Sequence, residues 1–208
     1  MSQVQEEPKV AKDTKEKILR AAMDLMALYG YKGASVRKIA KAVGIRESAI
    51  YNHFKNKEEI FKTILASLFT TPFDDFFENH PPEKDAIEGK NYLMKFAATI
   101  KELSFDARNE KLFRIIMLEI MQSDEVRKQF LKYFFDENIK KLSTAFFVMM
   151  QHALIRSGDP ILMAQEFFAP LFYYRLEITL FRMDERPTHS LSSIFEKHVD
   201  FFWEGIAL

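Results

Sequence analysis

Basic side chains gather near the start of the chain, where their charge can neutralise a polyanion. Residues 13–62 contain eleven Lys or Arg and six Asp or Glu, a net charge of +5 in a chain whose 208 residues sum to zero. The part after residue 62 therefore carries a net negative charge. A basic segment on an acidic body is typical of proteins that contact nucleic acid with one end.

The sequence lacks the patterns of common catalytic and metal sites. It has no Cys, which excludes disulfides and thiolate metal sites. No Gly-rich phosphate loop, nucleophile elbow or HExxH motif is present. The histidines outside the basic segment lack metal-ligand spacing; they are His80, His152, His189 and His198. We therefore expect no enzyme activity, no cofactor and no metal.

The remaining composition indicates a soluble helical protein. Hydrophobic residues make up 48% of the chain, enough for a sizeable core. No window approaches the roughly 18 apolar residues of a membrane span, and the polar start MSQVQEEPKV is unlike a secretory signal. We expect a cytoplasmic protein without membrane contact.

Gly and Pro are scarce, and apolar residues recur with helical period, which predicts an all-α chain of about nine helices. The first is expected to begin at Asp13 and stop at Gly30, with Ser35 and Asn56 capping the second and fourth. The fourth is expected to reach about Thr71. Later helices are expected near 85–105, 108–121, 124–156, 160–183 and 190–206, after breaks at Pro72 and His80-Pro81-Pro82.

Two short helices around Gly44-Ile45, after a longer supporting helix, form a helix-turn-helix pattern. A small apolar core is expected to lock them at a steep angle; it consists of Ile39, Ala40, Val43, Ile45 and Ile50. This core pushes the third helix, about 47–54, outward, so that its first residues can enter a DNA major groove.

The stretch from Gly30 to Phe61, GYKGASVRKIAKAVGIRESAIYNHFKNKEEIF, closely resembles the DNA-binding domain of the TetR family. Beyond it, the chain resembles the family only in length and helical character. The resemblance implies a flexible tail over 1–12, a helix-turn-helix domain over 13–59, and a helical ligand-binding and dimerisation domain over 60–208.

The resemblance also implies contacts to the DNA backbone. Tyr51 and His53 correspond to a phosphate-contacting pair, and Lys57 to a further contact at the start of the fourth helix. Ser35 can donate to a phosphate as well, and Lys55 completes this group.

Base edges are expected to be read by the neighbouring exposed side chains, which are Arg37, Glu47, Ser48, Ala49 and Asn52. Arg37 suits guanine, Asn52 adenine and Glu47 the amino group of cytosine. Family members often have Ser or Thr where Arg46 stands, and Arg46 cannot cap the recognition helix. We expect Arg46 to contact a phosphate instead. Glu47 either adds base specificity or simply stabilises the helix through its negative charge at the positive end of the helix dipole.

Nineteen of the 21 Phe and seven of the ten Met follow residue 62. They serve as core and dimer interface, and they also suit the wall of an apolar cavity. The candidate ligand-binding residues, inward by periodicity, are Tyr92, Phe96, Phe113, Met117, Met121, Phe146, Met150, Phe168 and Phe172. Glu119 lies on an apolar face and, if buried, needs a partner, for which Arg175 is a possible one. The pair is then a structural bridge or a polar anchor of the pocket; the alternative is that both side chains are exposed.

The resemblance implies a homodimer formed by the last two helices, over 160–183 and 190–206. The side chains expected to meet the partner are Phe167, Leu171, Tyr174, Ile178, Phe181, Ile194, His198, Phe201 and Phe202. Such a dimer binds two half-sites of a roughly palindromic operator.

The sequence thus predicts a repressor released from double-stranded DNA by a small apolar or aromatic effector. Ligand binding is expected to shift helices around Pro170, and the fourth helix to transmit the movement to the recognition helices. The alternative is a ligand-independent, nucleoid-associated or protein-interaction factor, which a closed core without a cavity would favour.

Overall fold

Helices build the whole of the described fold, as the apolar periodicity predicted. The computed structural model describes residues 9–69 and 72–208, and within them there is no strand, only an isolated bridge between Ile155 and Ala207. In the same residues no helix has the length and apolar character needed to cross a membrane. They also contain no group of three or more His, Asp or Glu side chains suited to a metal ion.

The chain divides into two compact units, which we describe separately. The first holds the chain up to Leu68 together with Lys111–Val126, and the second holds Phe69–Glu110 and Arg127–Leu208. Segment 111–126 therefore joins the unit that contains the helix-turn-helix pattern. Residues 1–8 of the predicted tail, and Thr71 at the predicted end of the fourth helix, lie outside the described residues.

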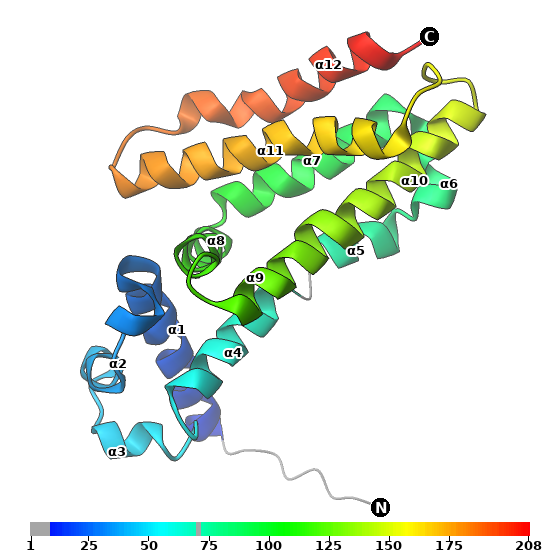
Figure 1. Ribbon diagram of the computed structural model, residues 1–208. Helices are drawn as coiled ribbons and strands as arrows, with labels where there is room; N and C mark the ends of the chain where they lie inside the picture. The colour runs from blue at the N-terminus through cyan, green and yellow to red at the C-terminus, as the bar shows by residue number, and fades with distance from the viewer. Residues whose placement is uncertain (1–8, 70–71) are drawn as a thin grey trace, which may run out of the picture. The chain divides into compact units, whose positions relative to one another are not determined.

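The first unit contains the N-terminal helices, coloured blue to cyan in Figure 1. Helix α1 (Lys9–Gly33) begins before the predicted Asp13 and is interrupted at Gly30, whose φ of 69° confirms the predicted stop. The next three helices are α2 (Val36–Val43), α3 (Glu47–Ile50) and α4 (Lys57–Phe69). Both predicted caps are confirmed: Ser35 Oγ accepts the Lys38 N–H at 3.2 Å, and Asn56 Oδ1 accepts the Glu59 N–H at 2.9 Å.

The second unit is a bundle in which α11 packs against α7, α10 and α12 (Figure 1). Its helices are α5 (Pro72–Asn79), α6 (Pro82–Asp85), α7 (Lys90–Phe105), α10 (Asn138–Gln151), α11 (Pro160–Met183) and α12 (Ile194–Ile206). Helices α8 (Ala107–Glu119) and α9 (Asp124–Phe130) are each divided between the two units, and a π-helical segment, Leu131–Glu137, leads from α9 into α10.

Aromatic rings fill the centre of the second unit. Phe96 is fully buried, and its ring centroid lies 5.2 Å from that of Phe76 and 5.9 Å from that of Phe73. Phe167 and Phe168 lie within 6.3 Å of it on the α11 side. These tilted and edge-to-face arrangements are the ones that aromatic quadrupoles favour.

Several predicted helix limits were wrong, and local backbone geometry explains the main one. The helix expected over 85–105 is divided at Gly89, whose φ of 60° and ψ of −120° are not helical. A Cβ at this position would lie 2.8 Å from the Trp203 ring, so only glycine fits. Helix α5 was not predicted, α3 ends earlier than expected, and the helix expected to reach 156 ends at Gln151.

His198 makes the second unit sensitive to pH. Its Nε2–H donates to the Phe167 carbonyl at 2.9 Å, and its ring stacks on Phe167 with centroids 5.4 Å apart. Burial lowers the pKa of His198, although the bond to the Phe167 carbonyl opposes this. The folded protein therefore resists protonation that the unfolded chain accepts at its ordinary pKa of about 6.5.

We expect the free energy of unfolding to fall as the pH drops below about 6.5, by at most about 1.4 kcal/mol per pH unit from this group. His198→Gln keeps a donor for Phe167 but has no titratable ring, so its stability is expected to change less over this range. Urea unfolding at pH 7.5, 6.5 and 5.5 measures the difference. Parallel pH profiles for the two proteins would contradict this role of His198.

Candidate nucleic-acid interface and ligand core

Residues 47–54, which we call the recognition segment, pack on a small buried core. Ile39 and Ile50 are fully buried, and Ala40 and Phe54 nearly so. Gly44 adopts a left-handed φ of 78°, and its N–H bonds to the carbonyls at the end of α2. After α3 the chain continues as a helical turn, because the Phe54 N–H donates to the Ile50 carbonyl at 3.0 Å. The side chains opposite this core face outward.

Most of the predicted DNA-contacting side chains are exposed on this unit. The exposed ones are Ser35, Arg37, Arg46, Glu47, Ser48, Tyr51, Asn52 and Lys55, whereas Ala49, His53 and Lys57 are partly covered. Arg46 makes no side-chain cap on α3, as its residue type predicted. Ser35 uses its oxygen to accept from Lys38, which leaves its hydroxyl hydrogen available to a phosphate. The arrangement therefore presents cations and hydrogen-bonding groups of both kinds on one domain.

Lys57 differs from the other predicted DNA-contacting residues because its ammonium group already contacts another residue of the first unit. Its Nζ donates to the Tyr31 carbonyl at 2.9 Å and lies 4.0 Å from the centre of the Tyr31 ring. Partial burial lowers the pKa of Lys57, and the negative charge of Glu119 opposes this. The predicted phosphate contact of Lys57 stays a prediction.

Glu119 has a partner that the sequence did not indicate. It is buried in the first unit, and its Oε1 accepts the Tyr31 N–H at 2.7 Å. Arg175 is buried in the second unit, where its Nη2 donates to the Asn109 carbonyl at 3.4 Å. These contacts lie within each unit, and the expected Glu119–Arg175 bridge stays a prediction.

Arg175 remains charged at neutral pH despite its burial. Desolvation lowers its pKa to about 10, while the negative field of Glu110 favours the protonated form. Because its planar guanidinium is buried and charged, Arg175 remains a candidate polar group of a ligand site in the second unit.

The predicted ligand-binding residues are divided between the two units. Tyr92, Phe96, Phe146 and Phe168 are buried in the second unit, where Met150 and Phe172 are partly covered. Phe113, Met117, Glu119 and Met121 belong to the first unit. The inward orientation expected of Met121 was wrong, since 83% of it is exposed. Periodicity failed there because α8 ends at Glu119, before that residue.

A groove of about 450 Å³ borders the aromatic core in the second unit. Phe76 and Leu103 provide apolar lining, and Asp75, Glu102 and Asp106 provide carboxylates. Phe76, which was not among the predicted ligand residues, also contacts the core ring Phe96. The groove therefore leads from a polar rim to the buried rings.

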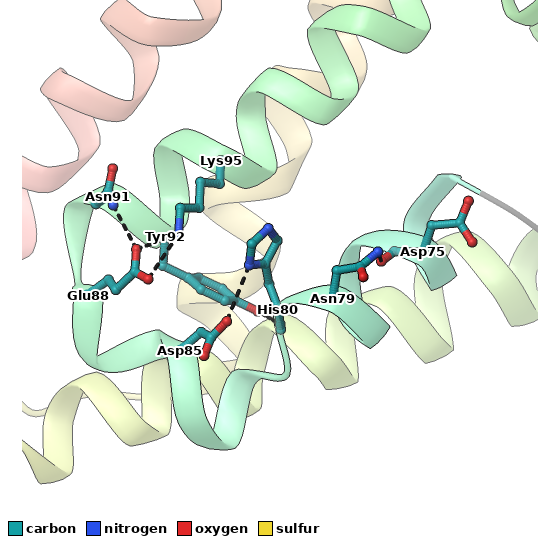
Figure 2. A network of polar contacts seen from close by, with 8 residues as sticks. All are labelled: Asp75, Asn79, His80, Asp85, Glu88, Asn91, Tyr92 and Lys95. Carbon is teal, nitrogen blue, oxygen red and sulfur yellow. Dashed lines mark hydrogen bonds and ion pairs between the residues drawn. The ribbon is translucent and has the colours of Figure 1, made fainter.

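A polar network fixes the chain beside this groove, as Figure 2 shows. The Glu88 carboxylate accepts from Lys95 at 2.9 Å and from Asn91 at 2.7 Å. His80 Nδ1 lies 3.2 Å from an Asp85 oxygen, and the buried Tyr92 hydroxyl donates to the His80 carbonyl at 3.3 Å. These contacts hold the turn between α5 and α7 in place.

Part of the predicted dimer surface is covered within the protomer itself. Phe167, Leu171, Ile178 and His198 are buried in the second unit, so they cannot form the outward face. Tyr174, Phe181, Ile194 and Phe202 are partly covered, whereas Phe201 is 78% exposed. Other apolar side chains of α11 are exposed instead, namely Ile161, Leu162, Tyr173, Leu180 and Met183.

Comparisons with known proteins agree with this architecture. The family described as bacterial regulatory proteins, tetR family, matches residues 18–64. The fatty acid metabolism regulator protein of Bacillus subtilis (strain 168) is 37% identical over 114 residues, which are 54% of this chain and 56% of that protein. The chain therefore matches little more than half the length of that relative.

A second relative aligns over more of its length. IcaR, the negative transcriptional regulator of the biofilm operon icaADBC of Staphylococcus epidermidis, is 28% identical over 171 residues, covering 81% of this chain and 83% of that protein. The solved structure of the transcriptional regulator FadR from Bacillus subtilis in complex with stearoyl-CoA has a TM-score of 0.61 at 24% identity. It covers 92% of this chain and 98% of that one. At this identity the structural likeness shows the fold.

Proposed function

We propose that this chain is a transcriptional regulator of the TetR family, and that it is a homodimeric repressor of a roughly palindromic operator, released by a small ligand with a large apolar part. The observation that carries this proposal is the recognition segment, whose polar side chains are exposed above a buried core of Ile39, Ile50 and Phe54. A segment built in this way can enter a major groove without unfolding its own support.

Asn52 is proposed to read a base, most simply adenine through its side-chain amide. Asn52→Ala is expected to weaken binding to a duplex selected by the wild type from a random pool by about 1–3 kcal/mol. Binding to an unrelated duplex should change little, because the lost contact is specific. Fluorescence anisotropy with both duplexes measures this.

Lys55→Ala is the control for Asn52→Ala, since Lys55 is exposed nearby but is proposed to contact a phosphate. It should weaken binding to both duplexes alike. An Asn52→Ala protein that loses equal affinity for both duplexes would show that Asn52 does not read sequence.

The dimer is proposed to form through the outward face of α11 together with Phe201 of α12. Leu162, Tyr173 and Leu180 are each about half exposed and recur at helical spacing on α11. Large exposed apolar side chains in a row favour burial against a second copy, and a two-fold axis makes the same face serve both protomers.

The ligand is proposed to place its apolar part among the rings around Phe96, entering past Phe76 from the groove. A long acyl chain suits this route, and two observations on similar proteins support it: a relative named for fatty acid metabolism and a similar fold holding stearoyl-CoA. Carboxylates at the groove rim disfavour an anionic head group there, so the head is proposed to extend out of the groove, away from Asp75 and Glu102. Ligand binding must favour the state that does not bind DNA.

The decisive experiment measures wild-type binding to its selected duplex with and without stearoyl-CoA. We expect tight binding without ligand and dissociation as stearoyl-CoA is added, with coenzyme A alone as the control. Equal affinity for every duplex together with no response to stearoyl-CoA would overturn the proposal that the protein is a ligand-released repressor. That result would support a ligand-independent DNA-binding factor. Release by coenzyme A alone would show that the acyl chain is not what is recognised.

A further inference from the structure

The interruption of α1 at Gly30 creates a need for a hydrogen-bond acceptor. With φ 69° and ψ 174° at Gly30, the helix cannot continue regularly into Tyr31. The Tyr31 N–H is partly buried and is satisfied by Glu119 Oε1 at 2.7 Å. An N–H to carboxylate bond of this length is a strong, charge-assisted one. A carboxylate from α8 thus fixes the corner at the end of α1.

The fit between Gly30 and Glu119 is close. A Cβ on Gly30 would lie 3.1 Å from Glu119 Oε1, and the positive φ already disfavours any other residue. The buried carboxylate also stabilises the charge on Lys57. The Glu119 carboxylate therefore occupies the space that a side chain at position 30 would need.

Tyr31 connects the Gly30–Tyr31 corner to α4. Its carbonyl accepts from Lys57 Nζ at 2.9 Å, and its ring packs against Phe61 with centroids 4.7 Å apart. Lys57 is the first residue of α4, and Phe61 lies one turn later. The start of α4 is thus tied to Glu119 through Tyr31, and α4 directly follows the recognition segment and Lys55-Asn56.

We propose that Glu119 is a positioning residue for DNA binding: its carboxylate holds the Gly30–Tyr31 corner and, through Tyr31, the Lys57 side chain and the start of α4. This rests on the proposed DNA-binding function and adds to it a control point outside the DNA-contacting surface. Helix α8 begins in the second unit and ends in the first, and Glu119 is its last residue.

The test compares three variants by anisotropy with the selected duplex and by hydrogen exchange of the Tyr31 amide. Glu119→Ala removes the acceptor, and we expect at least tenfold weaker DNA binding and at least tenfold faster exchange. Glu119→Gln keeps an acceptor oxygen and should stay within threefold of the wild type in DNA binding. Asp24→Ala removes the 2.6 Å ion pair of Lys111 with Asp24, which also joins α1 to α8, and should likewise stay within threefold.

These outcomes separate positioning from general stability. Equal losses in Glu119→Ala and Asp24→Ala would show that any weakening of the α1–α8 contact suffices, and would overturn the proposal. If Glu119→Ala does not fold, Glu119→Asp takes its place, because its shorter side chain keeps the negative charge but moves the carboxylate away from the Tyr31 N–H. Unchanged DNA binding in that folded variant would also overturn the proposal. A wild type that binds no duplex even at low ionic strength overturns the proposed function itself, whereas wild-type binding matched by Glu119→Ala overturns this inference alone.

Discussion

Leu180→Asp is expected to convert the dimer into monomers and to lower operator affinity at least a hundredfold. Leu180 is 51% exposed on α11, on the face that we propose meets the partner. A carboxylate there is removed from water in the dimer without a designed partner, at a cost of several kcal/mol for each copy. The monomer keeps one recognition segment and loses the second half-site, so the affinity of the two-site complex is lost.

Light scattering after size exclusion measures the mass, and anisotropy with the selected duplex measures the affinity. Leu131→Asp is a matched control, because Leu131 has a similar exposure of 47% but lies in the π-helical segment before α10. It should remain dimeric and bind as the wild type does. If Leu131→Asp were monomeric and Leu180→Asp were not, the dimer would use a different face.

Phe96→Ala is expected to lower the free energy of unfolding by about 3–5 kcal/mol, the range for deleting a large buried aromatic ring. Phe96 is fully buried, and aromatic rings from α5 and α11 surround it, so the cavity cannot close without moving several of them. The lost edge-to-face contacts add to the lost burial. Urea unfolding monitored by circular dichroism gives the difference.

Phe96→Leu is the control, since it keeps most of the volume and should cost less than about 1.5 kcal/mol. A loss below about 1 kcal/mol in Phe96→Ala would mean that the cluster is loosely packed.

Local signals in the sequence predicted the helix caps and the turn of the first unit well. Ser35, Gly44 and Asn56 fix helix ends through contacts with residues a few positions away, so their roles can be read without the fold. Arg46 was correctly expected not to cap α3. The same local logic failed at Gly89, because the ring of Trp203, distant in sequence, is what requires a glycine there.

Local signals of this kind could not predict hydrogen-bond partners that are distant in sequence. Glu119 was recognised as a carboxylate that needs a partner, but its partner is a backbone N–H 88 positions away, which no side-chain pattern marks. Arg175 was suggested as the partner because both residues lie on apolar helix faces; within the second unit its Nη2 donates to the Asn109 carbonyl.

The sequence by itself determined an all-helical chain, the helix-turn-helix pattern near its start and the polar side chains that this pattern exposes. These depend on periodicity, caps and turns, which act over a few residues. Only the tertiary structure decided that 111–126 joins the first unit, and that Phe167 and Ile178 face inward on α11 while Tyr173 and Leu180 face outward. The physical reason is that α11 is apolar on nearly every side, so its periodicity marks no single buried face, and the neighbouring helices select it.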